Sequence, residues 1–256
     1  EKQCVGGFGS IIDTVIMNGC TNNGNVYLKG SRGIAGGFVA RVALNAGDNC
    51  LEIYNSTNNG NITVEDTYIA ADGTQGTGAA DAGGLVGHIG CSKNIGVYKI
   101  WGCTNNGNID ALYRAGGLVG YCYASKAAAF IDMQFCINTG DVTMGEVNIN
   151  KGWIGGVAGC SHAPCLLTRC HNLGNVTVAT NKVSGASAFI GGISGLAGWE
   201  SNTYADLYVV SGCNNYGIVT IGKGAVKDGW RFSGGIAGMA YGGSGRTDGK
   251  GLLIDN

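Results

Sequence analysis

The chain has 256 residues, of which 45% are hydrophobic, so it is long enough to bury a core as one large domain or two small ones. Its 49 glycines and single proline exclude collagen-like and proline-rich disordered chains. Charged residues make up 13% of the chain and the net charge is −1, which excludes the basic surface that nucleic acids or anionic membranes require. No apolar run is long enough for a membrane-spanning helix, so no membrane insertion is expected in this segment.

Two short motifs divide the chain into repeats. The first, (Cys/Ser)-x-Asn-x-Gly-x-(Val/Ile), occurs around Gly24, Gly60, Gly107, Gly140, Gly174 and Gly217. The second, Gly-Gly-apolar-x-(Gly/Ala), follows each copy at residues 36–40, 83–87, 116–120, 155–159, 191–195 and 234–238, and a further copy, GGFGS, lies at 6–10. Self-similarity at this spacing predicts a solenoid.

The elements of one repeat follow in chain order from the Cys or Ser of the first motif, taken as position zero. Positions −5 and −3 are apolar and predict a strand, and glycines at −1 in three repeats predict a corner after it. Positions +6 and +8 are apolar around a mostly polar +7, which predicts a second strand. We expect about three short strands per repeat, separated by corners.

Stacking the repeats as parallel strands places equivalent residues next to one another. The sequence therefore predicts an all-β fold, a right-handed parallel β-helix (β-solenoid) of about six coils that forms a single domain over residues 1–256. Position +2 predicts a buried ladder of amides at Asn22, Asn58, Asn105, Asn138, Asn172 and Asn215. Position zero predicts a ladder of buried thiols at Cys20, Cys103, Cys136, Cys170 and Cys213.

The two motifs together resemble the GLUG-type repeats, whose glycine–leucine–glycine signature is GGLVG at residues 83–87 and 116–120. Such repeats occur in large bacterial cell-surface proteins, including non-catalytic parts of some IgA-cleaving metallopeptidases. The resemblance implies an extracellular or cell-surface location, with a surface protein or glycan of a host or neighbouring cell as the partner. It does not imply protease activity, because the chain has no HExxH motif.

Of the other six cysteines, Cys165 lies in the inward −5 column, and five lie outside both columns, at Cys4, Cys50, Cys91, Cys122 and Cys160. A disulfide is expected there first, and Cys91–Cys122 is the favoured pair because both residues follow a GGLVG copy in adjacent coils. The segment CSHAPCLLTRCH at 160–171 is dense in potential zinc ligands but lacks close CxxC pairs, so a plain corner is preferred to a metal site.

Neither a catalytic residue nor a cofactor-binding residue is predicted. The acidic residues are scattered, except for Glu65, Asp66, Asp72 and Asp81 in an insertion at 65–82, where a solvated loop is preferred to a weak calcium site. Glycine-rich phosphate loops are not indicated, because no candidate opens a helix.

Aromatic residues outside the inward columns are candidate surface-binding residues, and the alternative is that they pack over coil corners. They are Trp101, Trp153, Trp199, Trp230, Tyr121 and Tyr123.

Three functions remain open at this stage. The first is a non-enzymatic adhesin, ligand-display scaffold or stalk. The second is a glycan-binding or glycan-cleaving β-helix, and the third is a filament subunit with head-to-tail self-association. Because the chain starts and stops within a repeat, with Leu252 and Ile254 matching positions −5 and −3, we also expect it to be a segment of a longer protein or a subunit covered by neighbouring copies.

Overall fold

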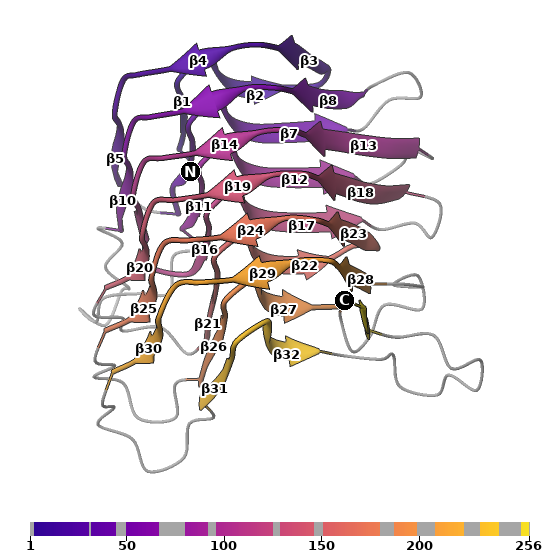
Figure 1. Ribbon diagram of the computed structural model, residues 1–256. Helices are drawn as coiled ribbons and strands as arrows, with labels where there is room; N and C mark the ends of the chain where they lie inside the picture. Colours follow the sequence, from indigo (N-terminus) through magenta and orange to yellow (C-terminus); the bar gives the residue numbers. More distant parts are fainter. Residues whose placement is uncertain are drawn as a thin grey trace.

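The computed structural model describes residues 3–30, 32–44, 50–66, 80–91, 96–124, 129–145, 151–179, 187–198, 208–222, 231–240 and 252–255. In these residues the chain forms a parallel β-solenoid, in which five sheets run along one axis and successive coils stack on one another (Figure 1). None of these residues forms a helix that is long and apolar enough to cross a membrane.

The five sheets are named A to E in the order in which one coil visits them. Sheet A contains β1 (Cys4–Gly6), β6 (Ile34–Gly36), β11 (Asp81–Gly83), β16 (Arg114–Gly116), β21 (Lys151–Gly155), β26 (Ser187–Gly191) and β31 (Arg231–Gly234). Sheet B contains β2 (Gly9–Ile12), β7 (Val39–Leu44), β12 (Val86–Cys91), β17 (Val119–Ala124), β22 (Ala158–His162), β27 (Ser194–Ala197) and β32 (Ala237–Ala240). Sheet C contains β3 (Val15–Asn18), β8 (Leu51–Tyr54), β13 (Gly96–Trp101), β18 (Ala129–Gln134), β23 (Cys165–Thr168), β28 (Tyr208–Ser211) and β33 (Leu252–Asp255).

The other two sheets contain six strands each. Sheet D contains β4 (Thr21–Asn22), β9 (Thr57–Asn58), β14 (Thr104–Asn105), β19 (Ile137–Asn138), β24 (His171–Asn172) and β29 (Asn214–Asn215). Sheet E contains β5 (Val26–Gly30), β10 (Ile62–Asp66), β15 (Ile109–Ala111), β20 (Val142–Met144), β25 (Val176–Val178) and β30 (Val219–Ile221).

Strands β1 to β30 make six coils of five strands each, which confirms the number of coils and corrects the expected three strands per coil. The difference arises at corners that the alternation of residues did not reveal. The two glycines of the second motif bend the chain between sheets A and B, and the corner at position −1 separates sheet C from the two-residue strands of sheet D.

The register matches the sequence columns in every coil. The −5 column pairs along sheet C, as in Tyr98 with Ile131, and the +6 column pairs along sheet E, as in Ile62 with Ile109. The match extends to β33, where Leu252 aligns with Tyr208 and confirms its expected position in the −5 column.

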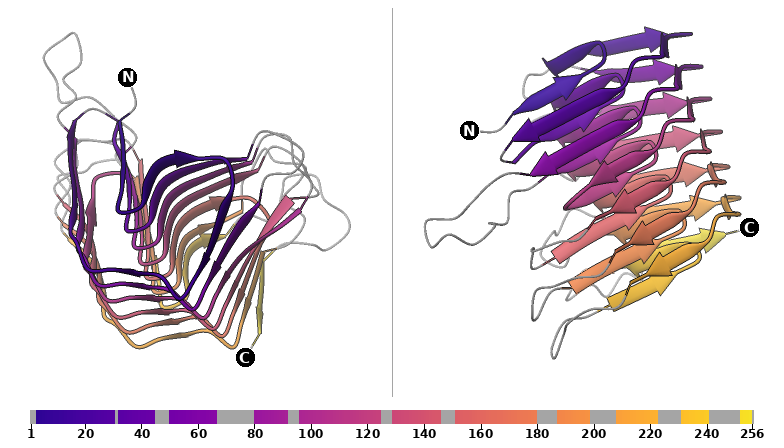
Figure 2. Two further views of the ribbon diagram at one scale, coloured as in Figure 1. Left: turned by 90° about the horizontal axis from the view of Figure 1, so that it is seen from above. Right: turned by 90° about the vertical axis from the view of Figure 1, so that its left-hand side faces the viewer.

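The inward side chains form two cores. One is enclosed by sheets B, C and D and the other by sheets A and E. Seen along the axis, the outline of the coil is indented between sheets A and B, which reach in towards sheet D (Figure 2, left). The solenoid is therefore narrow in the middle, with one core on each side of the narrow part.

The corner at position −1 has a left-handed backbone in all six coils. Gly19, Gly102 and Gly212 adopt it with φ of 65°, 63° and 59°, while Phe135 and Arg169 adopt it with φ of 54° and 50°. Asn55 takes the same place in the second coil with φ of 48°. Since a bulky residue avoids positive φ, the corners at Phe135 and Arg169 each store on the order of 1–3 kcal/mol of backbone strain.

The two sequence motifs meet in the narrow part of the coil. An added Cβ at Gly84, the second glycine of its motif, would lie 2.3 Å from Cγ of Asn105 and 2.1 Å from the carbonyl oxygen of Gly117. Glycine is required there because the backbone packs directly on the amide ladder. At Gly107 of the first motif the reason is also crowding, since a Cβ would lie 1.9 Å from the carbonyl oxygen of Gly60.

The predicted amide ladder is present. Asn105 Nδ2 donates to Asn138 Oδ1 at 2.8 Å and to the carbonyl oxygen of Gly107 at 2.7 Å, and its own Oδ1 accepts from Asn58 Nδ2 at 2.8 Å. The same pattern links all six asparagines, and the middle four are fully buried. Asn22 and Asn215, at the two ends, are half-buried.

The thiols of position zero also form a ladder, and they act as hydrogen-bonding groups as well as buried apolar ones. The Cys136 thiol accepts from the amide N–H of Cys103 at 3.4 Å and donates to the carbonyl oxygen of Ile100 at 3.1 Å. In the second coil the hydroxyl of Ser56 accepts from the N–H of Cys20 at 3.0 Å. This shared role explains why the motif accepts either Cys or Ser.

Replacing Asn105 by Leu should lower the free energy of unfolding by ~3 kcal/mol or more, because buried partners on Asn58 and Asn138 lose their hydrogen bonds. Urea unfolding followed by circular dichroism would measure the loss. The matched control is Asn106→Leu, which alters an exposed amide beside it and should cost less than about 1 kcal/mol. Equal losses in the two variants would contradict a stabilising role for the buried ladder.

Candidate functional site

The indentation between sheets A and B is filled by side chains that point away from both cores. We call this region the wedge, and its centre is a cluster of Tyr121, Trp153, Cys160, Phe189 and Leu196. Trp153 and Tyr121 are only 5% and 8% exposed, so the expectation that these rings form an exposed binding surface is wrong. They face outwards from their own sheets, but the facing sheet covers them.

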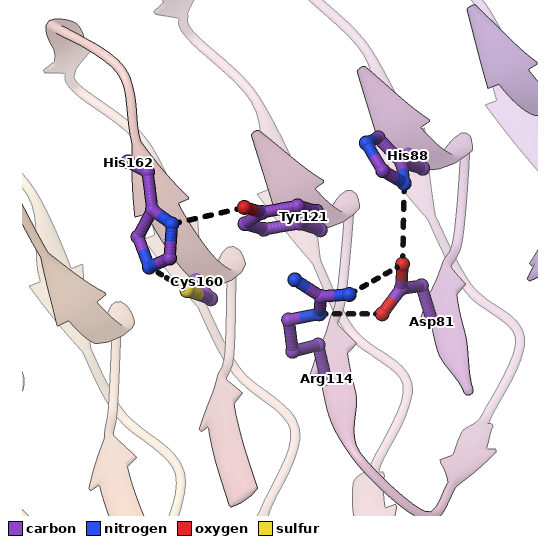
Figure 3. A network of polar contacts seen from close by, with 6 residues as sticks. All are labelled: Asp81, His88, Arg114, Tyr121, Cys160 and His162. Carbon is purple, nitrogen blue, oxygen red and sulfur yellow. Dashed lines mark hydrogen bonds and ion pairs between the residues drawn. The ribbon is translucent and has the colours of Figure 1, made fainter. Parts of the chain in front are cut away.

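A buried ion pair lies beside this cluster. Arg114, from β16, donates from Nε and Nη2 to the two carboxylate oxygens of Asp81, from β11, and the second of these bonds is 3.0 Å long (Figure 3). Asp81 is 1% exposed, which corrects its assignment to a solvated loop. Burial would raise the pKa of Asp81, but Arg114 and then His88 outweigh burial and hold this pKa below its ordinary value.

His88 approaches the same carboxylate from β12. Its Nδ1 lies 3.3 Å from Asp81 Oδ2, close enough for an electrostatic contact but outside hydrogen-bonding geometry. Burial lowers the pKa of His88, and the contact with Asp81 offsets only part of that effect. The imidazole is therefore neutral at neutral pH, and the charge of Asp81 is balanced by Arg114.

A second set of contacts continues along sheet B. The Arg114 guanidinium lies 3.5 Å from the ring centre of Tyr121, which is a cation–π distance. The Tyr121 hydroxyl lies 2.9 Å from Nδ1 of His162, and Nε2 of His162 lies 3.3 Å from the Cys160 sulfur (Figure 3). These polar and aromatic contacts link three successive coils, from Asp81 in the third to His162 in the fifth.

The Cys160–His162 contact resembles the pairing of a nucleophile with a base, but its electrostatics oppose that use. Cys160 is fully buried, and burial raises the pKa of its thiol. Burial, followed by the charge of Arg114, lowers the pKa of His162 to about 3. A reactive cysteine needs an accessible, stabilised thiolate, so this arrangement favours a structural role.

We expect the free energy of unfolding to fall as the pH is lowered from about 6.5 towards 3. The folded chain holds the pKa of His162 at about 3, whereas the unfolded chain protonates this imidazole near 6.5, so the unfolded state binds more protons across that window. One such group contributes up to about 1.4 kcal/mol per pH unit. His88, whose pKa is also lowered, acts in the same direction.

Urea unfolding at a series of pH values would measure this slope. The variant His162→Gln removes the titrating group and should give a flatter profile than the parent chain, while His171→Gln controls for loss of an imidazole outside the wedge. A profile as steep in His162→Gln as in the parent would show that the slope has another origin.

The remaining predicted aromatic residues lie in different places. Trp101 is half-buried on the outer face of sheet C, where its ring is 5.7 Å from that of Tyr54 and 5.5 Å from Nζ of Lys99. Tyr123 is 39% exposed, consistent with a surface position. Trp199 and Trp230 lie outside the described residues.

The corner between sheets D and E carries two further ladders on its outer surface, which the sequence columns did not predict. At position +3, Asn106 Nδ2 donates to Asn59 Oδ1 at 2.8 Å, and at position +5, Asn61 Oδ1 accepts from the backbone N–H of Asn108 at 2.9 Å. All three asparagines of the NNGN sequence therefore bond to their equivalents in neighbouring coils. Their recurrence in the first three coils was a visible signal for these ladders.

The last three of the six coils depart from this pattern on the outer face alone. In the first three coils, positions −1, +1 and +3 are Gly or Asn, Thr and Asn. In the last three coils, six of these nine positions carry larger side chains, which are Phe135, Ile137, Arg169, His171, Leu173 and Tyr216. Four of these, Phe135, Ile137, Arg169 and His171, border a shallow depression of about 510 Å³ together with Gly212, and the ring of Tyr216 lies 6.4 Å from that of His171. We call this region the outer corner patch.

The cysteines and acids expected to form other sites do not do so. Cys122 carries a free, buried thiol, and it aligns with Ile89 while Cys91 aligns with Ala124, so the expected Cys91–Cys122 disulfide is wrong. The two cysteines follow their GGLVG copies at different distances, four residues in one case and two in the other. Cys50 and Cys160 are also free.

The sequence contains two candidate metal sites, at 160–171 and at 65–82. Among the described residues, no group of three or more His, Cys, Asp or Glu side chains is placed to hold a metal ion. Glu65 is exposed and pairs with Lys29 at 3.7 Å, while Asp72 and the side chain of Asp66 lie outside the described residues.

Comparison with protein families, curated proteins and solved structures finds no match to this chain.

Proposed function

We propose that this chain is a non-enzymatic segment of an extracellular or cell-surface repeat protein, which acts as an adhesin, ligand-display scaffold or stalk. The observation that carries the proposal is the contrast between the two sides of sheet D. Its inner side keeps the same amide in all six coils, whereas the outer side and the corners beside it change in the last three coils to residues that include Phe135, Arg169 and Tyr216. A constant interior with a variable exterior is the arrangement that a display scaffold needs.

The polar network of the wedge supports a structural reading. Its groups are buried, Asp81 is neutralised by Arg114, and the pKa values of Cys160 and His162 are shifted away from those of a working nucleophile and base. Such a network fixes the angle between sheets A and B and so stabilises the solenoid. The likeness of the two motifs to GLUG-type repeats supports a surface location for the same chain.

Antibodies raised against the purified chain should label intact cells of the source organism, and external protease should remove that label. Immunofluorescence before and after permeabilisation would measure the accessible fraction, with a cytoplasmic protein as the control for cell integrity. Beads coated with the chain should also adhere to partner cells, unlike beads coated with an unfolded sample. Labelling that requires permeabilisation would contradict the proposed location.

A glycan-binding role is favoured by one specific observation, the outer corner patch, where exposed rings adjoin a cationic side chain and an imidazole.

A further inference from the structure

We propose that the outer corner patch binds the acidic sugar residues of a glycan, such as uronic or sialic acids, with Arg169 holding the carboxylate. This inference rests on the proposed display function and gives that function a ligand class. It involves residues other than the Trp and Tyr side chains first considered for surface binding.

The backbone shows that large side chains at these corners come at a structural cost. Phe135 and Arg169 occupy the left-handed position where Gly19, Gly102 and Gly212 stand in other coils. Glycine would be free of strain in both places, and the fold does not need a side chain there. Strained backbone conformations of this kind are concentrated at functional sites, where the side chain is retained for its function although it lowers stability.

The side chains at the patch combine the groups that sugars require. Phe135 is 51% exposed and Tyr216 is 70% exposed, so both rings present apolar area to solvent. The Arg169 guanidinium lies 5.6 Å from the ring centre of Phe135, which positions the cation beside an aromatic face. His171 Nδ1 lies 3.4 Å from Asn214 Nδ2, and this pair adds polar groups at the same place.

The charge of the patch indicates an acidic ligand. Among the described residues, no carboxylate forms an ion pair with Arg169, and no Asp or Glu lines the depression. A guanidinium binds a carboxylate through two parallel hydrogen bonds and discriminates against neutral groups. The volume of about 510 Å³ lies within the range of small-ligand sites.

The lateral position of the patch favours a glycan over an acidic peptide. Peptides commonly bind by adding a strand to an open sheet edge, but the backbone groups beside the patch are already paired between coils, as in Phe135 N–H with the carbonyl oxygen of Thr168. His171 N–H is likewise bonded to the carbonyl oxygen of Cys136. Only side chains are therefore available for binding at this surface. Aromatic side chains can stack on a sugar ring, and Arg169 can bind its carboxylate.

Calorimetry would measure the affinity of the purified chain for matched pairs of glycans. One pair compares a sialylated glycan with its desialylated form, and the other compares a glycan that contains uronic acid with a neutral one. Arg169→Gly should weaken binding of the acidic glycan by about tenfold or more and remove the preference for it. Phe135→Gly should weaken binding of acidic and neutral glycans alike. Both variants install the residue that other coils carry, so their melting temperatures should be equal to or above that of the parent chain.

Asn55→Gly is the matched control, since it makes the same change at the same corner of the second coil, outside the patch, and should leave binding unchanged. Equal affinity for acidic and neutral glycans, or unchanged binding in Arg169→Gly, would overturn the inference. So would Arg169-dependent binding of polyglutamate that exceeds glycan binding, because the ligand would then be an acidic peptide.

The outcomes separate this inference from the display function. If antibodies label the chain on intact cells but the chain binds no acidic glycan, the display function stands and the proposed ligand is wrong. If the chain binds acidic glycans through Arg169 but is not found at the cell surface, the proposed location is wrong and the proposed binding site stands.

Discussion

The contact between the amide ladder and the glycine pairs is the constraint on which the rest of the structure depends. At the narrow part of each coil, backbone at Gly84 and its equivalents touches the amides of the Asn ladder, with no room for a Cβ. This contact joins the two cores and fixes the positions of sheets A, B and D relative to one another. The segments between these contacts can differ in length. The spacing between successive motifs therefore ranges from 33 to 47 residues while the register is constant.

The fold could be predicted from the sequence because each coil of a solenoid carries the same kinds of residue at equivalent positions. One chain was enough to predict the Asn column, the −5 column and the register of Leu252, because each position occurs six times in the six coils. The outline of the coil was not readable. Alternation shows that a side chain such as Trp153 points away from its own core, but only the angle between sheets A and B shows that it points into another buried region.

The candidate site could not be predicted from the large aromatic residues, because it lies where the repeat is interrupted. Trp153 stacks on Phe189 inside the wedge, at a centroid distance of 6.0 Å. The outer corner patch instead contains Phe135 and Arg169 at a position that Gly or Asn holds in the other coils. The change at −1 was visible in the aligned repeats, yet its meaning depends on the left-handed backbone there, which a column of mixed residues does not reveal.

The amide ladders also give the solenoid a direction. Along the inner row each Nδ2 donates to the coil that follows, from Asn22 to Asn58 and onwards to Asn215, while along the outer row Asn59 and Asn106 donate to the coil that precedes. The dipoles of the two rows oppose one another in the first three coils. Thr139 ends this outer row in the fourth coil, whereas the inner row continues and its donors point towards Asn215. A stack of nearly neutral composition thereby acquires a weak electrical polarity along its axis, from side chains that carry no formal charge.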